Sequence, residues 1–111
     1  MNNIQSGRHY ELIALDYLIT LGFSFIEKNF HSRHGEIDLI MQKDSVLHFI
    51  EVKSSKCMQP LEKITPKKIE KITKTINIFL KQKQISCAFC IDALSIYKDN
   101  IIFIENITFD L

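Results

Sequence analysis

The chain of 111 residues has few of the features that mark fibrous, secreted or membrane-spanning proteins. Its three glycines and two prolines exclude collagen-like and low-complexity classes. No apolar run approaches the ~18 residues that a membrane-spanning helix needs, and residues 1–3 are too polar to begin a signal peptide. Three cysteines, an odd number, favour reduced thiols over a disulfide framework. We therefore expect a soluble, cytoplasmic protein without membrane contact.

Apolar side chains are sufficient for one compact core. Hydrophobic residues make up 46% of the chain and charged residues 24%, and the length suits one domain rather than two. A domain of this length buries roughly two-thirds of the surface that its unfolded chain exposes. The composition therefore predicts a single domain over residues 1–111.

The small net charge of +1 conceals an uneven distribution. Residues 62–83 hold seven lysines and two glutamates, which gives this segment a charge of +5 and leaves −4 for the rest. A basic segment can bind a phosphate backbone while an acidic one binds cations. The alternative interpretation is an ordinary lysine-rich helix face in contact with solvent.

Hydrophobic periodicity and turn residues predict seven elements in the order αβββαββ, which is an α/β domain with a mixed sheet and packed helices. The first helix covers residues 6–21 and ends before Gly22, and the second begins after the N-cap Thr65 and continues to about Lys83. Five strands are expected at residues 23–29, 37–42, 46–53, 86–97 and 101–109, and residues 30–35 are expected to form a loop.

A tight turn at Asp44 and Ser45 fixes the register of the central hairpin. It pairs Lys43 with Val46, so that Asp38 is expected opposite Glu51 and Glu36 opposite Lys53. Paired side chains lie about 4.5–5.5 Å apart, and two like charges there destabilise the sheet unless a cation lies between them.

Opposed carboxylates are suited to a hard divalent ion. Asp38 and Glu51 could share Mg²⁺, which keeps several waters and can bind a phosphate oxygen. Lys53 beside them could hold a water or neutralise charge that develops on phosphorus. This set is sufficient for metal-dependent phosphodiester hydrolysis. The alternative is an exposed ion-pair ladder in which Lys53 neutralises Glu51 and Glu36.

Two motifs carry a resemblance to a known family. Residues 29–40 read N-F-H-S-R-H-G-E-I-D-L-I, and residues 49–53 read F-I-E-V-K. Together they resemble the YraN family of small bacterial proteins, which is similar to Holliday-junction resolvases and to the PD-(D/E)xK nuclease superfamily. The resemblance extends to Tyr10 and Glu11 in the first predicted helix. It implies a restriction-endonuclease-like core, a mixed β-sheet flanked by helices.

The resemblance also implies roles for individual residues. It makes Asp38 and Glu51 metal ligands, the Val52 carbonyl a third ligand and Lys53 the catalytic lysine. Glu11 would be an acid from the first helix that can reach the metal.

The resulting hypothesis is an endonuclease dependent on Mg²⁺ or Mn²⁺ that cleaves DNA, including branched or damaged DNA. Lys67, Lys68 and Lys71 at the start of the second helix are predicted to bind phosphates, because a helix N-terminus attracts anions. A homodimer is one expected form, since junction-cleaving relatives work as dimers. The alternative is a nucleic-acid-binding or scaffold protein that retains the fold without catalysis.

Other candidate residues receive structural interpretations. Cys87 and Cys90 are expected inside a strand on opposite faces, as small buried hydrophobes rather than zinc ligands. His31 and His34 are expected in a loop. The aromatic residues are expected to fill the core, including Phe79, Phe89 and Phe103.

Overall fold

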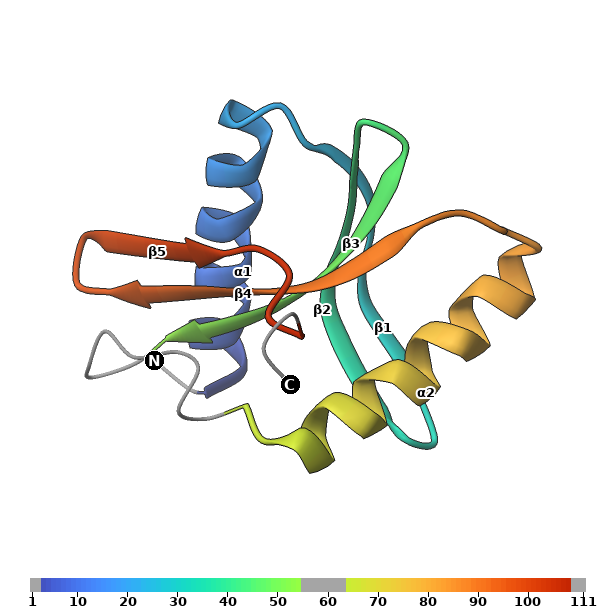
Figure 1. The fold of residues 1–111 in the computed structure, drawn as a ribbon. Coiled ribbons are helices and arrows are strands. Elements are labelled where there is room, and N and C mark those ends of the chain that lie inside the picture. Colours follow the sequence, from blue (N-terminus) through green and yellow to red (C-terminus); the bar gives the residue numbers. More distant parts are fainter. Residues whose placement is uncertain (1–2, 55–63, 109–111) are drawn as a thin grey trace.

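The computed structural model describes residues 3–54 and 64–108, and it has the predicted element order (Figure 1). The elements are α1 (Asn3–Thr20), β1 (Ser24–Ser32), β2 (Gly35–Lys43), β3 (Val46–Ser54), α2 (Pro66–Lys83), β4 (Phe89–Tyr97) and β5 (Asn100–Ile104). This mixed sheet with two helices is consistent with the α/β nuclease-like core that the resemblance implied. Cys57, Glu62 and Lys63 lie outside the described residues.

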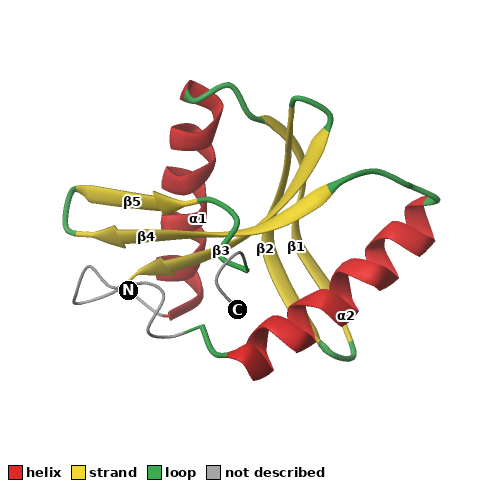
Figure 2. Ribbon diagram, viewed as in Figure 1, coloured by secondary structure: helices red, strands yellow, loops and turns green. Residues whose placement is uncertain are grey.

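The five strands form one sheet in the order β1-β2-β3-β4-β5. The neighbours β3 and β4 are parallel and all other pairs are antiparallel, so α2 is the crossover between the parallel strands (Figure 2). Each helix covers its own apolar cluster. One contains Ala14 and Leu18 of α1, and the other contains Ile72, Ile76 and Phe79 of α2.

The start and the apolar face of α2 match the prediction. The Thr65 side chain caps the helix by accepting a hydrogen bond from the Lys68 N–H at 3.2 Å, and Pro66 follows it. Ile72, Ile76 and Phe79 are buried, which leaves the lysines on the remaining faces. The helix therefore packs through its apolar stripe.

The expected loop at residues 30–35 is shorter than predicted. Phe30 and His31 pair with Ile37 and Glu36, so β1 continues to Ser32 and only the turn at Arg33 and His34 remains. Pairing with β2 overrides the weak strand propensity of this polar stretch. His31 is consequently a strand residue, whereas His34 lies in the turn as expected.

Further corrections concern the last two strands. Residues 86–88 precede β4 and residues 105–108 follow β5, so both strands are shorter than predicted. Cys87 therefore lies outside the sheet and is exposed, and Cys90 is half-buried, so the prediction of two buried cysteines was wrong. Phe79 is buried in the cluster under α2, as predicted, and Phe103 is half-buried against the cluster under α1. Phe89 is 38% exposed, so its predicted place in the core was wrong.

The register of the central hairpin is confirmed from Lys43 opposite Val46 to Leu39 opposite Ile50. Asp44 and Ser45 both have positive φ, as a two-residue hairpin turn requires. The pairing ends before Asp38, so neither expected cross-strand pair, Asp38 with Glu51 or Glu36 with Lys53, forms in this register. On its other side, β3 pairs with β4, where Ser95 is the register partner of Lys53. The two strands separate at the position of the acidic residues.

A local irregularity accompanies this separation. Ile37 shares a cluster with Ile40 although Leu39 and Met41 belong to the other cluster. Residues three apart in a regular strand point to opposite faces, so the alternation of β2 changes phase around Asp38. On β1, Asn29 lies between the paired residues Lys28 and Phe30 and has a φ of 53°. Both strands therefore deviate at the level of Asp38.

Candidate active site

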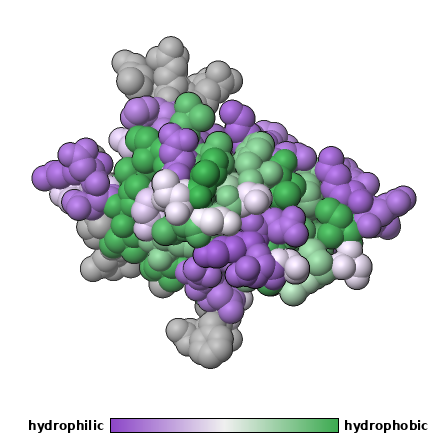
Figure 3. Space-filling model, turned by 90° about the horizontal axis from the view of Figure 1, so that it is seen from above, coloured by the Kyte–Doolittle hydropathy of each residue, from purple (hydrophilic) through white to green (hydrophobic). Residues whose placement is uncertain are grey.

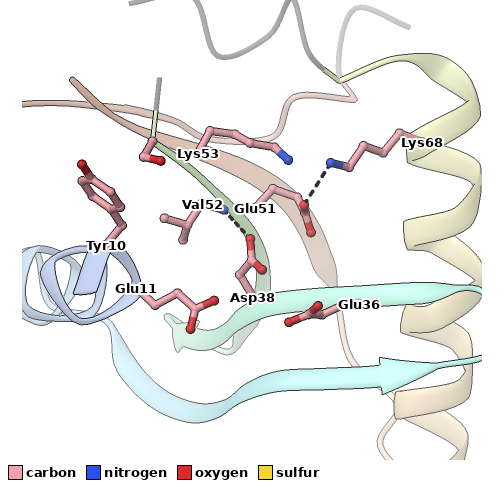
Figure 4. A pocket seen from close by; sticks show the side chains of 9 residues that line it. Tyr10, Glu11, Glu36, Asp38, Glu51, Val52, Lys53 and Lys68 are labelled. Atoms are coloured by element: carbon pink, nitrogen blue, oxygen red, sulfur yellow. Dashed lines mark hydrogen bonds and ion pairs between the residues drawn. The ribbon is translucent and has the colours of Figure 1, made fainter. Parts of the chain in front are cut away.

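A pocket of about 380 Å³ opens where β2 and β3 separate (Figure 4). Four elements contribute its lining side chains, which are Tyr10 and Glu11 from α1, Glu36 and Asp38 from β2, Glu51, Val52, Lys53 and Ser54 from β3, and Lys68 from α2. The structure thus brings together Glu11, Asp38, Glu51, Val52 and Lys53, the residues assigned to catalysis or metal binding from the sequence. Lys67 and Lys71 lie outside this pocket.

Asp38 bridges the gap between the separated strands. Its Oδ2 atom accepts a hydrogen bond from the Val52 N–H at 2.8 Å. Burial, and next the negative charge of Glu51, raise the pKa of Asp38 to about 7, against the lowering effect of the Val52 hydrogen bond. The surroundings of Asp38 therefore destabilise its ionised form.

Glu51 is buried deeper than Asp38 and is incompletely satisfied. It is 4% exposed, and its Oε2 atom lies 3.6 Å from Lys68 Nζ. Its Oε1 atom is buried and has no hydrogen-bond partner among the described residues. Burial raises the pKa of Glu51, and the charges of Lys68 and Lys53 only partly oppose this effect. An unpartnered buried carboxylate oxygen costs free energy that a bound cation would recover.

Lys53 projects into the same space as the acids, with its ammonium group toward Lys68 (Figure 4). Burial, followed by the neighbouring Lys68 charge, lowers the pKa of Lys53, and Glu51 and Asp38 act in the opposite direction. A lysine with a lowered pKa exchanges protons more readily near neutral pH than an exposed one.

A second set of carboxylates meets at the mouth of the pocket. Oxygens of Glu11, Glu36 and Asp38 lie within 4.8 Å of one another. Glu36 is more exposed and also lies 3.9 Å from His31 Nδ1. Because the donors around Asp38 are all oxygens, the set fits a hard cation such as Mg²⁺ or Mn²⁺ better than a soft one. A cation here could be held by the carboxylates of Glu11 and Asp38 and by the unpartnered Oε1 atom of Glu51.

Sequence reasoning missed the position of Lys68 in this pocket. Lys68 was assigned to a DNA-binding helix face, yet its Nζ atom contacts Glu51. The signal was its place three residues after the N-cap Thr65 on the helix that follows the Glu51 strand. Tyr10 was also not assigned a role, although it precedes Glu11 and lines the pocket. Lys67, Lys68 and Lys71 surround a second, smaller groove together with Thr65.

The fold and the pocket define a small α/β protein with clustered carboxylates and a lysine at the open end of a β-hairpin. The chain belongs to the family described as "Uncharacterised protein family UPF0102", the YraN family, which matches residues 10–96. None of the helices within residues 3–54 and 64–108 is long and apolar enough to cross a membrane.

Curated relatives cover nearly the whole chain. A UPF0102 protein of Helicobacter hepaticus is 46% identical over 108 residues, 97% of this chain and 98% of the relative. One from Helicobacter pylori strain HPAG1 is 50% identical over 103 residues, 93% of this chain and 90% of the relative. One from Wolinella succinogenes is 44% identical over 108 residues, 97% of this chain and 99% of the relative. The chain is therefore similar in extent to these UPF0102 proteins.

Proposed function

We propose that this protein is an endonuclease that depends on Mg²⁺ or Mn²⁺ and hydrolyses phosphodiester bonds in DNA, with branched or damaged DNA as its substrate. The observation that carries the proposal is the pair of acids Asp38 and Glu51, both with raised pKa and one with an unpartnered buried oxygen, beside Lys53. The ion pair of Glu51 with Lys68 and the nearby charge of Lys53 alone do not satisfy these carboxylates. A purely structural ladder would leave less charge uncompensated.

The pocket contains the atoms needed to hold a divalent cation. Asp38 and Glu51 would be its main ligands, Glu11 would reach it from α1, and the Val52 carbonyl would be a further ligand. Bound Mg²⁺ supplies a water of lowered pKa and stabilises charge on the phosphate. The proposed substrate, DNA, is a polyanion. The lysines at the start of α2 supply positive charge beside the acidic pocket, where they could bind its phosphates.

The chain's own side chains would divide the remaining work. Lys53 is close enough to the acids to orient a water and to donate hydrogen bonds to phosphate oxygens, and its lowered pKa favours proton exchange. Lys68 holds Glu51 in place through its ammonium group. The Val52 N–H donates to Asp38 Oδ2 and so fixes the orientation of this carboxylate. The Oδ1 atom of Asp38 would then be available to the cation.

Calorimetry with Mn²⁺ and cleavage assays on four-way-junction and duplex DNA test this proposal together. We expect Asp38→Ala to abolish both Mn²⁺ binding in the pocket and cleavage. Asp16→Ala, at an exposed acid of α1 outside the pocket, should leave both unchanged, and Glu36→Gln should have a milder effect than Asp38→Ala. If Asp38→Ala binds Mn²⁺ with the same affinity as the wild type, Asp38 is not part of the metal site and the assignment is wrong.

A second candidate function is DNA binding without catalysis. The groove formed by Thr65, Lys67, Lys68 and Lys71 supports this function. Its lysines could bind DNA phosphates whether or not the protein cleaves DNA. Tight binding of junction DNA by the wild type, with no cleavage in Mg²⁺ or Mn²⁺ and no change in Asp38→Ala, would support this function.

The active form would be a homodimer, since a branched substrate presents more than one strand for cleavage. Large apolar side chains reach the surface of α1 and β1, with Leu12 and Ile19 51% exposed and Phe25 45% exposed. On the face seen from above in Figure 3, apolar surface is interspersed with polar surface. Sedimentation analysis of the wild type and of Ile19→Glu would test this proposal, and a wild type that stays monomeric would contradict it.

A further inference from the structure

A second group of metal-ligating side chains lies on the parallel pair β3 and β4. His48 of β3 is the register partner of Cys90 of β4, and Asp92 follows Cys90 by two residues on the same face. His48 Nδ1 lies 3.1 Å from Cys90 Sγ and 2.6 Å from Asp92 Oδ2. The Cys90 thiol also donates to Asp92 Oδ1 at 3.2 Å. Three different ligand types therefore converge outside the acidic pocket.

Two of these side chains are inside the protein and the third reaches the surface. His48 is 6% exposed and Asp92 is fully buried, whereas Cys90 is half-buried. A groove of about 470 Å³ gives access to His48 and Cys90, and Glu105 and Asn106 form part of its wall. The cluster is thus buried on one side and accessible from the groove on the other.

The arrangement does not suit a cysteine nucleophile. In a Cys–His–Asp triad the thiol and the carboxylate contact different ring nitrogens, whereas here both face Nδ1 of His48. Burial, and next the charge of Asp92, raise the pKa of Cys90 to about 12. A thiol of this kind stays protonated and unreactive in the absence of a cation.

We propose that His48, Cys90 and Asp92 bind one thiolate-preferring divalent cation, with Zn²⁺ the best chemical fit, and that its open position faces the groove. Zn²⁺ takes cysteine sulfur, histidine nitrogen and carboxylate oxygen as ligands. Bond lengths of about 2.0–2.3 Å in a tetrahedral site require the three ligand atoms to move apart by about 0.3–0.8 Å, with the largest change between His48 and Asp92. Such a shift is within the reach of side-chain rotation.

Charge and hydrogen bonding support this assignment. As the bond from Sγ to the cation forms, the thiol proton leaves for solvent, and the divalent charge balances the thiolate and the Asp92 carboxylate. The Asn106 N–H donates to Asp92 Oδ1 at 2.8 Å and so orients this ligand from the segment after β5. The donor set contains sulfur and nitrogen, unlike the all-oxygen acidic pocket, so the two sites select different metals.

Titration of the full chain, first treated with a chelator, tests this inference with Co²⁺ as the probe and Zn²⁺ as the competitor. We expect a thiolate-to-cobalt charge-transfer absorption in the near ultraviolet that Zn²⁺ abolishes. Cys90→Ser should lose this absorption and bind Zn²⁺ more weakly by at least the roughly 10–100-fold that loss of a residue supporting a ligand costs. Cys87→Ser, at an exposed cysteine three residues away, and Cys57→Ser should both keep it, as should Asp38→Ala.

A readout on the wild type keeps the test independent of how the variants fold. Zn²⁺ binding should release about one proton, measured by calorimetry in buffers of different ionisation enthalpy. Absence of both the absorption and the proton release would overturn the inference, and so would an absorption that survives in folded Cys90→Ser. Asp38→Ala alters the acidic pocket and leaves His48, Cys90 and Asp92 in place. The cobalt and zinc results would therefore stand even if the proposed nuclease function failed.

Discussion

The β2–β3 hairpin has two halves that contribute differently to stability: the half near the turn buries apolar side chains, and the open half buries charged ones. In the half near the turn, Leu39, Ile40, Phe49 and Ile50 are at most 1% exposed and their strands are in regular register. In the open half the pairing ends, and Asp38 and Glu51 are buried with raised pKa values. The turn half therefore contributes burial free energy, whereas the open half holds charges at a cost.

This difference indicates how a small sheet can hold two buried carboxylates close together. The regular half fixes the strands, so the open half can keep two carboxylates in a position that they would not adopt unaided. Substitutions in the two halves should then have opposite signatures, namely lost stability in one and lost chemistry in the other.

The largest effect is expected from Lys53→Ala in the open half. If Lys53 acts on the water or on the phosphate, DNA cleavage should fall by about 1000-fold, while the fold and most of the DNA affinity remain. Single-turnover cleavage and DNA binding measured on the same preparation would separate the two. Lys98→Ala, at an exposed lysine in the β4–β5 turn, is the control. A large loss of stability with unchanged activity per folded molecule would favour the ion-pair ladder instead.

In the turn half, Phe49→Ala should lower the free energy of unfolding by about 3–5 kcal/mol. Phe49 is 1% exposed and its ring packs edge-on against Phe79 and Phe89, so truncation leaves a cavity. Urea unfolding measures this loss, and Phe49→Leu offers a milder variant if the alanine does not fold. An Asp38→Asn variant destabilised as strongly as Phe49→Ala would contradict the division of the hairpin.

The pH dependence of stability sharpens the same comparison. Because the pKa of Asp38 is raised to about 7, the folded state binds more protons than the unfolded state between about pH 4 and pH 7. The metal-free protein should therefore lose stability as pH rises through this range, on the order of 4 kcal/mol from Asp38. Asp38→Asn should flatten this slope in urea titrations at several pH values. A stability that increases over the same interval in the wild type but not in Asp38→Asn would show the opposite sign.

The smallest effect is expected from the lysines beside the pocket. Lys67→Gln combined with Lys71→Gln should reduce the slope of log DNA affinity against log salt by about 1.8, or 0.9 for each phosphate contact. Lys68 is left intact because it also contacts Glu51. Lys81→Gln combined with Lys83→Gln, at the other end of α2, is the matched control. Equal slopes for the two double variants would remove the start of α2 from the DNA-binding surface.

Local signals made part of this molecule predictable. The turn at Asp44 and Ser45 fixes the hairpin register, and Thr65 with Pro66 fixes the start of α2, because both depend on neighbouring residues alone. The same turn brings Asp38 and Glu51 near each other on two adjacent strands, although the pairing ends at Leu39 and Ile50 and the two acids are not register partners.

Long-range arrangement accounts for what was missed. The contact of Lys68 with Glu51 depends on how α2 docks. The place of Lys68 three residues after Thr65 puts it in the first turn of α2, but this spacing alone does not show that its side chain reaches Glu51. The cluster of His48, Cys90 and Asp92 depends on the parallel register of β3 with β4, which no turn sets. The strand assignment of Phe30 and His31 required knowledge of their partners on β2.

The parallel pairing of β3 with β4 also bears on the order of folding. The three strands β1, β2 and β3 are joined by short turns, whereas β4 joins β3 only after the chain has passed through α2. Closing this longer loop costs more entropy, so we expect the meander of three strands to form first. Asp38 and Glu51 would then meet while still hydrated, and the docking of α2 would remove water from Glu51 as it delivers Lys68.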